Sequence, residues 1–196
     1  MMRNNMENND LILAEIREHQ DTVATLTDPE LLSSITAAAR LVTSVIAAGK
    51  KILVFGNGGS ASDAQHIAAE FTGRYVKERR GLPAIALTTD TSALTAISND
   101  YGFARVFARQ VEALAQPGDL AIGISTSGNS ENVLQGLITA KGLDCHTLGL
   151  TGNGGGKIAT LSDVLLNVNS KTTARIQEMH ILIGHVLCSA VDRIYE

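Results

Sequence analysis

The spacing of hydrophobic positions changes along the chain and divides it into predicted helices and strands. Up to residue 48, apolar side chains recur every three to four residues and predict helices over residues 11–24 and 29–48. Asp28 followed by Pro29 is typical of the start of the second helix. Residues 1–10 are polar and lack this spacing, so we expect a flexible leader followed by one domain over residues 11–196.

From residue 51 onward, short apolar runs alternate with helical segments. The runs predict strands over residues 51–55, 84–88, 120–125, 146–150 and 164–168. Helices are predicted over residues 60–71, 92–99, 103–115, 130–141 and 173–194, with a short helical segment near residue 157. Strands that are apolar on both faces and separated by helices are typical of a parallel sheet covered on each side.

The expected fold is therefore α/β: a three-layer α/β/α sandwich with a five-stranded parallel sheet of the flavodoxin-like kind, preceded by two N-terminal helices. Those two helices are candidates either for a subunit interface or for ordinary core packing. In such sheets, ligands bind beyond the carboxyl ends of the strands, where the strand order reverses. We expect the site at that edge.

Composition and charge narrow the class of protein. The 196 residues are 44% hydrophobic with a net charge of −4, which argues against nucleic acid or an anionic membrane as the main partner. No apolar run approaches the roughly 20 residues of a membrane span, and residues 1–10 have no signal-peptide core, which favours the cytoplasm. The basic cluster at residues 77–80 is interpreted as a solvated loop, and Cys145 and Cys188 as reduced packing residues.

The first candidate site is the glycine-rich loop Gly56-Asn-Gly-Gly-Ser60 between a predicted strand and a predicted helix. Glycines permit a sharp turn, and the unpaired N–H groups at the start of a helix attract anions. The loop lacks the lysine of a P-loop and the third glycine spacing of the dinucleotide motif. It is either a phosphate cradle or a tight strand-to-helix turn.

The second candidate site is Ser125-Thr-Ser-Gly-Asn-Ser130, which follows the strand at 120–125 and leads into another helix. Hydroxyl groups and helix-end N–H groups together hold phosphate without a lysine. A serine-rich capping turn is the alternative, but it explains only one or two of these residues. We favour phosphate binding, and a phosphosugar over a nucleoside triphosphate.

His66 and Glu70 lie four residues apart in the helix after the first loop, so their side chains share one helix face. A histidine and a carboxylate in this arrangement are typical of a metal site or of an acid–base pair. The spacing alone leaves both interpretations open.

Several short motifs, spread over about residues 30–192, match those of a known family in order and spacing. They lie at residues 56–60, 63–66, 70, 72–75, 99–102, 124–130, 150–152 and 175–180. In this combination they resemble the phosphoheptose isomerase family, whose members have the sugar-isomerase (SIS) fold and serve bacterial heptose synthesis.

The resemblance implies one zinc ion per subunit, with His66, Glu70, Gln177 and His185 as the ligands. It also implies that Glu70 is the catalytic base and His185 its proton-relaying partner. Gln177 and His185 are eight residues apart, about 12 Å along a helix. They share an ion only if they lean together or come from different chains.

The family interconverts sedoheptulose 7-phosphate and D-glycero-D-manno-heptose 7-phosphate through an enediol, as the first step of ADP-heptose or GDP-heptose precursor synthesis for lipopolysaccharide. By resemblance, the protein is a homotetramer with active sites between subunits. The implied substrate-binding residues are Asn57, Gly58, Gly59, Ser60, Glu70, Asn99, Asp100, Ser125, Thr126, Ser127, Ser130 and Gln177.

One departure and one rival qualify the resemblance. Some family members carry an aspartate where this chain has Ala174, so no catalytic role is assigned there. The rival is a non-catalytic SIS module that binds a replication initiator protein and shares several motifs, but it lacks residues matching Glu70 and His185. A sugar-phosphate sensor is a third possibility, although no DNA-binding segment is visible.

Overall fold

The computed structural model describes the backbone of residues 2–195 and the side chains of residues 8–195. Its centre is a five-stranded sheet in the order β2-β1-β3-β4-β5, with every neighbouring pair parallel. The strands are β1 (Ile52–Gly56), β2 (Ala84–Ala86), β3 (Leu120–Ser125), β4 (His146–Gly152) and β5 (Val164–Val168). This confirms the predicted parallel sheet.

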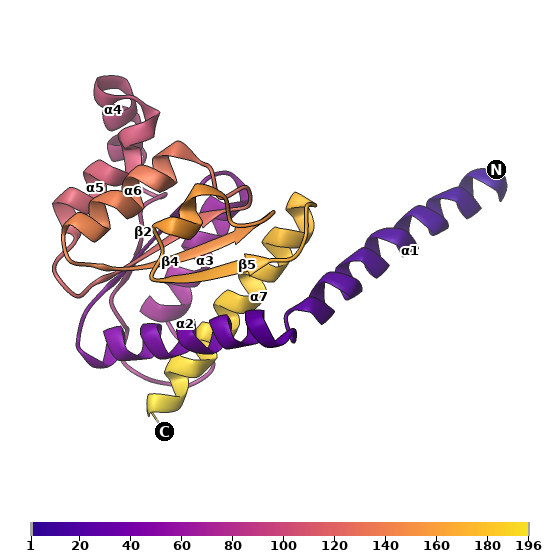
Figure 1. Ribbon diagram of the computed structural model, residues 1–196, viewed down its shortest axis with the longest axis horizontal. Helices are drawn as coiled ribbons and strands as arrows, with labels where there is room; N and C mark the ends of the chain where they lie inside the picture. Colours follow the sequence, from indigo (N-terminus) through magenta and orange to yellow (C-terminus); the bar gives the residue numbers. More distant parts are fainter. Residues whose placement is uncertain (1, 196) are drawn as a thin grey trace.

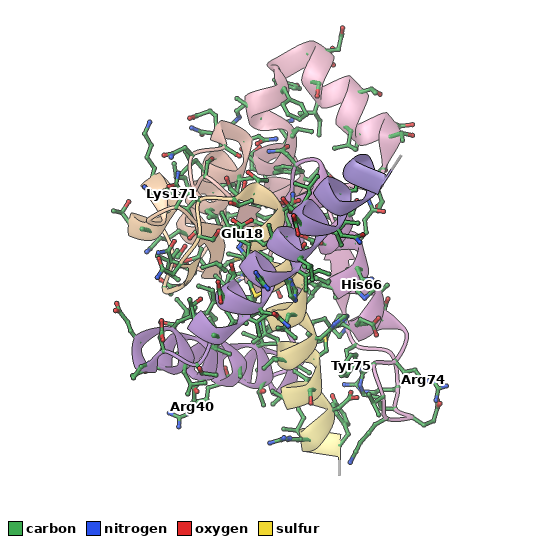
Figure 2. The ribbon with its side chains drawn as sticks, turned by 90° about the vertical axis from the view of Figure 1, so that its right-hand side faces the viewer. Glu18, Arg40, His66, Arg74, Tyr75 and Lys171 are labelled. Carbon is green, nitrogen blue, oxygen red and sulfur yellow. The ribbon has the colours of Figure 1, made fainter. Side chains whose placement is uncertain are left out.

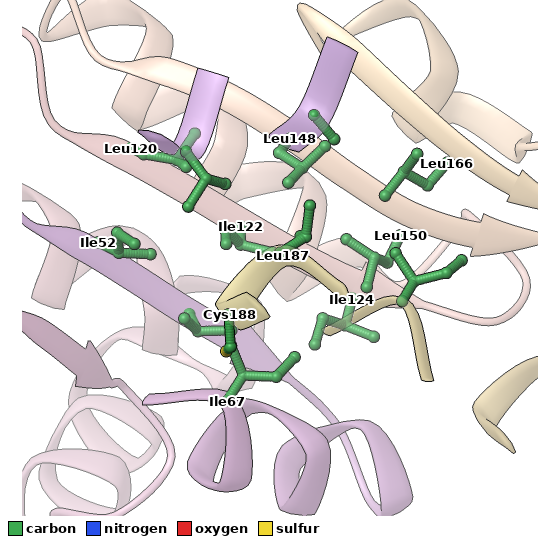
Figure 3. Packing of buried hydrophobic residues seen from close by; sticks show 14 of the residues in the cluster. Ile52, Ile67, Leu120, Ile122, Ile124, Leu148, Leu150, Leu166, Leu187 and Cys188 are labelled. Atoms are coloured by element: carbon green, nitrogen blue, oxygen red, sulfur yellow. The ribbon is translucent and has the colours of Figure 1, made fainter. Parts of the chain in front are cut away.

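Helices cover both faces of the sheet (Figure 1). On one face lie α2 (Pro29–Ala47), α3 (Gly59–Thr72) and α7 (Thr173–Asp192), whose apolar side chains form one core with Val54, Ile122 and Leu150 of the sheet. Figure 3 shows this packing, with Ile67 of α3 and Leu187 of α7 against the strands. On the other face lie α5 (Val106–Leu114) and α6 (Glu131–Gly142), packed around Phe55. The three-layer prediction is confirmed.

The remaining helices lie outside the two layers. Helix α4 (Thr91–Tyr101) has no buried residue, and it packs mainly against α5 and the short 3₁₀ helix η1 (Phe103–Arg105). Two further 3₁₀ helices are η2 (Gly156–Thr160) and η3 (Arg193–Tyr195). The predicted short helical segment near residue 157 corresponds to η2.

Helix α1 (Met2–Thr25) projects from the body and is longer than the helix predicted over residues 11–24 (Figure 1). Residues 2–10 are part of this helix, and residue 1 lies outside the described residues, so the flexibility of residues 1–10 stays a prediction. Apolar spacing marks the part of a helix that packs against a core, so it does not report where an exposed helix begins. Polarity alone was a poor guide to the helix start.

Helix α2 is, among the described residues, long and apolar enough to cross a membrane by length and composition. No apolar run of this length was predicted from the sequence. Its residues Ile35, Val42 and Val45 are buried in the core beneath the sheet. A core helix passes the same test of length and composition, and 33% of this window is buried, so the run is weak evidence for a membrane span.

The carboxyl ends of the central strands place the two glycine-containing loops side by side. Gly56 at the end of β1 pairs with Ile124 in β3, and both strands run directly into the loops before α3 and α6. A side chain at Gly56 would come within 2.9 Å of the Ile124 carbonyl oxygen, so only glycine permits this approach. Both helix N-termini therefore open on the same edge of the sheet.

Candidate active site

His66, Glu70 and His185 come together where α3 and α7 lie side by side. The Nε2 atoms of His66 and His185 are 2.9 Å apart, and His66 Nε2 is 3.2 Å from Glu70 Oε1. The three side chains offer donor atoms that all lie within 4.8 Å of one another. Residues more than a hundred positions apart in the sequence thus form one cluster.

The local sequence explains this meeting. His66 and Glu70 stand one turn apart on α3, and His185 approaches them from α7. Gly184 faces Ile67 of α3, and a side chain at Gly184 would come within 2.8 Å of Ile67 Cγ1. The missing side chain therefore lets the two helices lie close enough for the histidines to touch.

The donor set fits a divalent metal ion such as zinc. Two imidazole nitrogens and a carboxylate oxygen are ligands that zinc accepts, and neighbouring ligand atoms of one tetrahedral ion lie roughly 3.3 Å apart. The separations of 2.9 Å and 3.2 Å match that spacing. The His66 side chain is 49% exposed and that of Glu70 23%, so an ion and a substrate can reach them.

Gln177, the fourth predicted ligand, also lies between α3 and α7 but away from the three clustered residues. A side chain at Gly59 would meet the Gln177 Nε2 atom at 2.5 Å, so this amide lies against the first turn of α3. His66 is seven residues further along that helix, about 10 Å by the helical rise. Within this chain Gln177 is beside the glycine loop, and its role as a ligand stays a prediction.

The two candidate phosphate loops are joined by side-chain hydrogen bonds. Asn57 and Asn132 exchange two amide hydrogen bonds of 2.8 Å between the loop after β1 and the start of α6. The hydroxyl of Ser125 lies 2.9 Å from that of Ser130 and 3.5 Å from that of Ser127. The predicted hydroxyl cluster is therefore formed within the chain.

The other predicted binding residues occupy different settings in and around these loops. Gly58 is exposed with a φ of 56°, whereas Ser60 is buried with its Cβ facing Gly56. Thr126 is half-buried, and its carbonyl oxygen accepts a hydrogen bond from the Gly152 N–H.

Asn99 and Asp100 lie apart from these groups. They sit on the exposed helix α4, where the Asn99 amide donates to the Asp100 carboxylate at 2.8 Å. Helix α4 packs mainly against α5 and η1, while His66 and His185 lie on the opposite face of the sheet. The fold of one chain does not bring these two residues to the histidine cluster.

Two ionisable groups near the cluster have perturbed pKa values. Burial raises the pKa of Asp63 to about 6, partly opposed by His66, and its Oδ2 atom is buried without a hydrogen-bond partner. Burial lowers the pKa of His180 to about 4, and its Nε2 donates to the Thr151 carbonyl oxygen at 3.0 Å. His180 is therefore neutral and part of the core, which indicates a structural role.

Sequence reasoning missed two features beside the cluster. The Tyr75 ring stacks on the His185 ring, with centroids 5.6 Å apart (His66 and Tyr75 are both labelled in Figure 2). The Arg79 side chain is only 2% exposed, so the interpretation of residues 77–80 as a solvated loop is wrong for Arg79. Its partner, Asp192, was the available signal, since a carboxylate on an apolar helix face requires a buried cation.

The fold and the site define a class: a sugar-isomerase-type domain, with two loops suited to phosphate at one edge of the sheet and a cluster that could hold a metal ion. A family model described as SIS domain matches residues 16–152. A phosphoheptose isomerase of Aliarcobacter butzleri (strain RM4018) is 58% identical over 181 residues, which cover 92% of this chain and 95% of that protein.

Two solved structures of phosphoheptose isomerases also match this chain. A phosphoheptose isomerase structure from Neisseria gonorrhoeae has a TM-score of 0.84 at 49% identity and covers 96% of this chain and 98% of that one. One from Francisella tularensis has a TM-score of 0.91 at 38% identity, covering 95% and 98%. The chain belongs to the phosphoheptose isomerase family and is an aldose–ketose isomerase. The initiator-binding alternative is not favoured.

Proposed function

We propose that this chain converts sedoheptulose 7-phosphate to D-glycero-D-manno-heptose 7-phosphate, the first step of heptose precursor synthesis for lipopolysaccharide. The observation that carries the proposal is the convergence of His66, Glu70 and His185 from α3 and α7, with α3 beginning at a loop suited to phosphate. The reaction class follows from family membership, and the particular sugar is the proposed part.

The proposed metal is zinc, held by His66, Glu70 and His185, with Gln177 as the predicted fourth ligand. When bound, a zinc ion supplies Lewis-acid polarisation of the sugar carbonyl and stabilises charge on its oxygen atoms. Two histidines and a carboxylate suit zinc better than they suit calcium or magnesium, which prefer oxygen ligands alone.

The proposed proton transfer uses the same residues. Glu70 removes a proton from one of the adjacent carbons C1 and C2, and the proton returns to the other carbon through the enediol. A lone pair that holds a metal does not hold a proton, but a carboxylate has two oxygens, so Glu70 has a second acceptor atom. His185 is the proposed proton-relaying partner; while its Nε2 holds a metal ion, only its other ring nitrogen, Nδ1, has a lone pair for that task.

We propose that the loops at the sheet edge bind the phosphate group of the substrate. The N–H groups opening α3 and α6 and the hydroxyls of Ser125, Ser127 and Ser130 favour a phosphate ester there. Asn99 and Asp100 lie on α4, so they reach an active site only in another copy of the chain. This supports a homotetramer with sites between subunits, which we propose to work in the cytoplasm.

Conservative substitutions test the assignment. Glu70→Gln and His185→Gln keep side-chain size but remove the base and a donor atom, so we expect turnover of sedoheptulose 7-phosphate to fall at least about 10³-fold. The measurement is aldose phosphate formation by purified protein with zinc. Glu78→Gln and His146→Gln replace exposed residues of the same types and serve as matched controls.

Two results would contradict the assignment: wild-type turnover in both site variants, or no turnover by zinc-loaded wild type. A wild-type thermal transition in each variant shows that the fold is intact.

A further inference from the structure

The ring of His185 is held from two sides. The His66 ring meets it edge-on, with centroids 5.0 Å apart and planes at 61°. The Tyr75 ring lies over its face, with centroids 5.6 Å apart and planes at 25°. An imidazole with one free face can rotate about its side-chain torsion, whereas a stacked aromatic ring opposes that rotation.

Tyr75 belongs to the anchored segment, residues 73–83, which joins α3 to β2. Immediately after the tyrosine, the backbone N–H groups of Val76 and Lys77 each donate to Asp192 Oδ2 at 3.0 Å. Asp192 stands on α7 seven residues after His185, two helical turns further along the same face. The helix that carries the histidine therefore also fixes the backbone that carries the tyrosine.

Arg79 completes the anchor and ties it to the helix that carries Glu70. Its Nε donates to Asp192 Oδ1 at 2.8 Å, and its two terminal nitrogens donate to the carbonyl oxygens of Phe71 and Glu70, each at 3.0 Å. The Arg79 and Asp192 side chains are 2% and 6% exposed. The C-terminal turn of α3 and the last turns of α7 are thus joined by one buried ion pair.

The pKa of Asp192 indicates that its ion pair with Arg79 is present at neutral pH. Burial alone would raise the pKa of Asp192, but the N–H groups of Lys77 and Val76 and the Arg79 guanidinium together hold that pKa below its ordinary value. Asp192 is charged at neutral pH, and each of its two oxygens is occupied by donors from the anchored segment.

We propose that Tyr75 is a positioning residue, which uses its ring to hold the His185 imidazole with Nε2 directed at His66 and Glu70. The aromatic ring of Tyr75, and not its hydroxyl group, makes this contact, because the rings of Tyr75 and His185 stack face to face. The Asp192–Arg79 anchor keeps Tyr75 in place. The consequence for catalysis rests on the proposed function, whereas the orientation of His185 does not.

The test compares Tyr75→Leu, which removes the ring, with Tyr75→Phe, which keeps it. The chain has five histidines, so their ring C–H signals can be resolved by NMR after isotope labelling and that of His185 assigned from His185→Gln. In metal-free protein the His185 signal should carry a ring-current shift in wild type and Tyr75→Phe and lose it in Tyr75→Leu. With cobalt(II) in place of zinc, the visible absorption bands should change in Tyr75→Leu alone.

In the isomerase assay, Tyr75→Leu should lower kcat by roughly 10- to 100-fold, the range for a misplaced catalytic group, with KM changed by less than about twofold. Val76→Ala, an exposed side chain in the same segment, is the matched control and should match wild type in every measurement.

An unchanged His185 signal and cobalt spectrum in Tyr75→Leu would overturn the proposal, as would equal effects of Tyr75→Phe and Tyr75→Leu. If wild type fails to turn over the sugar, the proposed function fails, but the NMR comparison still decides the role of Tyr75.

Discussion

His180 shows how burial decides the role of a single residue. It lies on α7 between Gln177 and His185, two residues predicted to serve the site, yet it is fully buried and donates to the Thr151 carbonyl oxygen. Its other ring nitrogen is buried without a partner, so protonation there finds no acceptor. The low pKa of about 4 follows from that environment.

This pKa has a consequence for acid stability. Between pH 6.5 and about 4 the unfolded chain binds a proton at residue 180 that the folded chain does not, so the free energy of unfolding falls as the pH is lowered through that window. The loss attributable to His180 is about 3 kcal/mol, because the pKa falls from 6.5 to about 4 and each pKa unit corresponds to about 1.36 kcal/mol.

Urea unfolding at pH 7.5 and pH 4.5, in the presence of a chelator, measures the effect. His180→Gln should show a smaller difference between the two pH values than wild type, whereas His146→Gln, with an exposed histidine replaced, should match wild type. An identical pH dependence in wild type and His180→Gln would show that His180 does not titrate in this window.

Sequence patterns identified candidate site residues better than they identified the residues that contact them in the fold. The four-residue spacing of His66 and Glu70 indicated a shared helix face, and the structure confirms that they meet. Nothing local to the sequence links Tyr75 to His185 or Arg79 to Asp192, because such contacts depend on how α3 and α7 cross. These pairs become visible only once the fold is known.

At the scale of elements, the loop after β3 depends on glycine at one position. Gly128 has a φ of 65°, and a side chain there would overlap the backbone carbonyl of Gly155 and approach the Gly156 nitrogen at 2.8 Å. The Gly128 carbonyl also accepts a hydrogen bond from the Ile158 N–H in η2 at 3.0 Å. The serine-rich loop and the β4–η2 connection therefore pack backbone to backbone.

Gly128→Ala should lower the free energy of unfolding by about 2–4 kcal/mol, because a left-handed conformation and an overpacked contact are both imposed on the new side chain. Gly142→Ala is the control: no atom lies within 4 Å of a side chain added at the end of α6. Chemical unfolding of the two variants measures the difference. Equal stabilities would contradict the close packing of these loops.

The strands and most helices were predictable because their apolar runs and helical spacing are local signals. Strand β2 is shorter than predicted, since only residues 84–86 pair with β1 and the chain then turns toward α4. The start of α1 was mispredicted because an exposed stretch of helix needs no apolar spacing. Periodicity finds the buried part of an element more reliably than its ends.

At the scale of the whole molecule, α1 presents apolar side chains to solvent in a single chain. Leu11, Ile12, Leu13 and Ile16 are each at least 47% exposed, while Glu15 and Glu18 pair with Arg175 or Thr172 to hold the helix on α7. An exposed apolar surface of this kind is typical of a protein interface. It agrees with the proposed homotetramer.

Paired substitutions on this surface test the assembly. Ile12→Glu with Ile16→Glu places two charges one turn apart on the apolar face, so we expect the assembly to dissociate or weaken, because burying unpaired carboxylates is costly. Light scattering after gel filtration should give about four times the 20.7 kDa of one chain for wild type and less for the double variant. A wild-type mass of one chain would contradict the tetramer.

The central claim is that the His66–Glu70–His185 cluster holds a zinc ion required for isomerisation of sedoheptulose 7-phosphate. The most direct measurement titrates zinc into chelator-treated protein while both bound metal and aldose phosphate formation are followed. We expect no turnover without metal and a rise in activity that ends at one zinc ion per chain. Full activity in the metal-free protein, or zinc binding that leaves the rate unchanged, would contradict it.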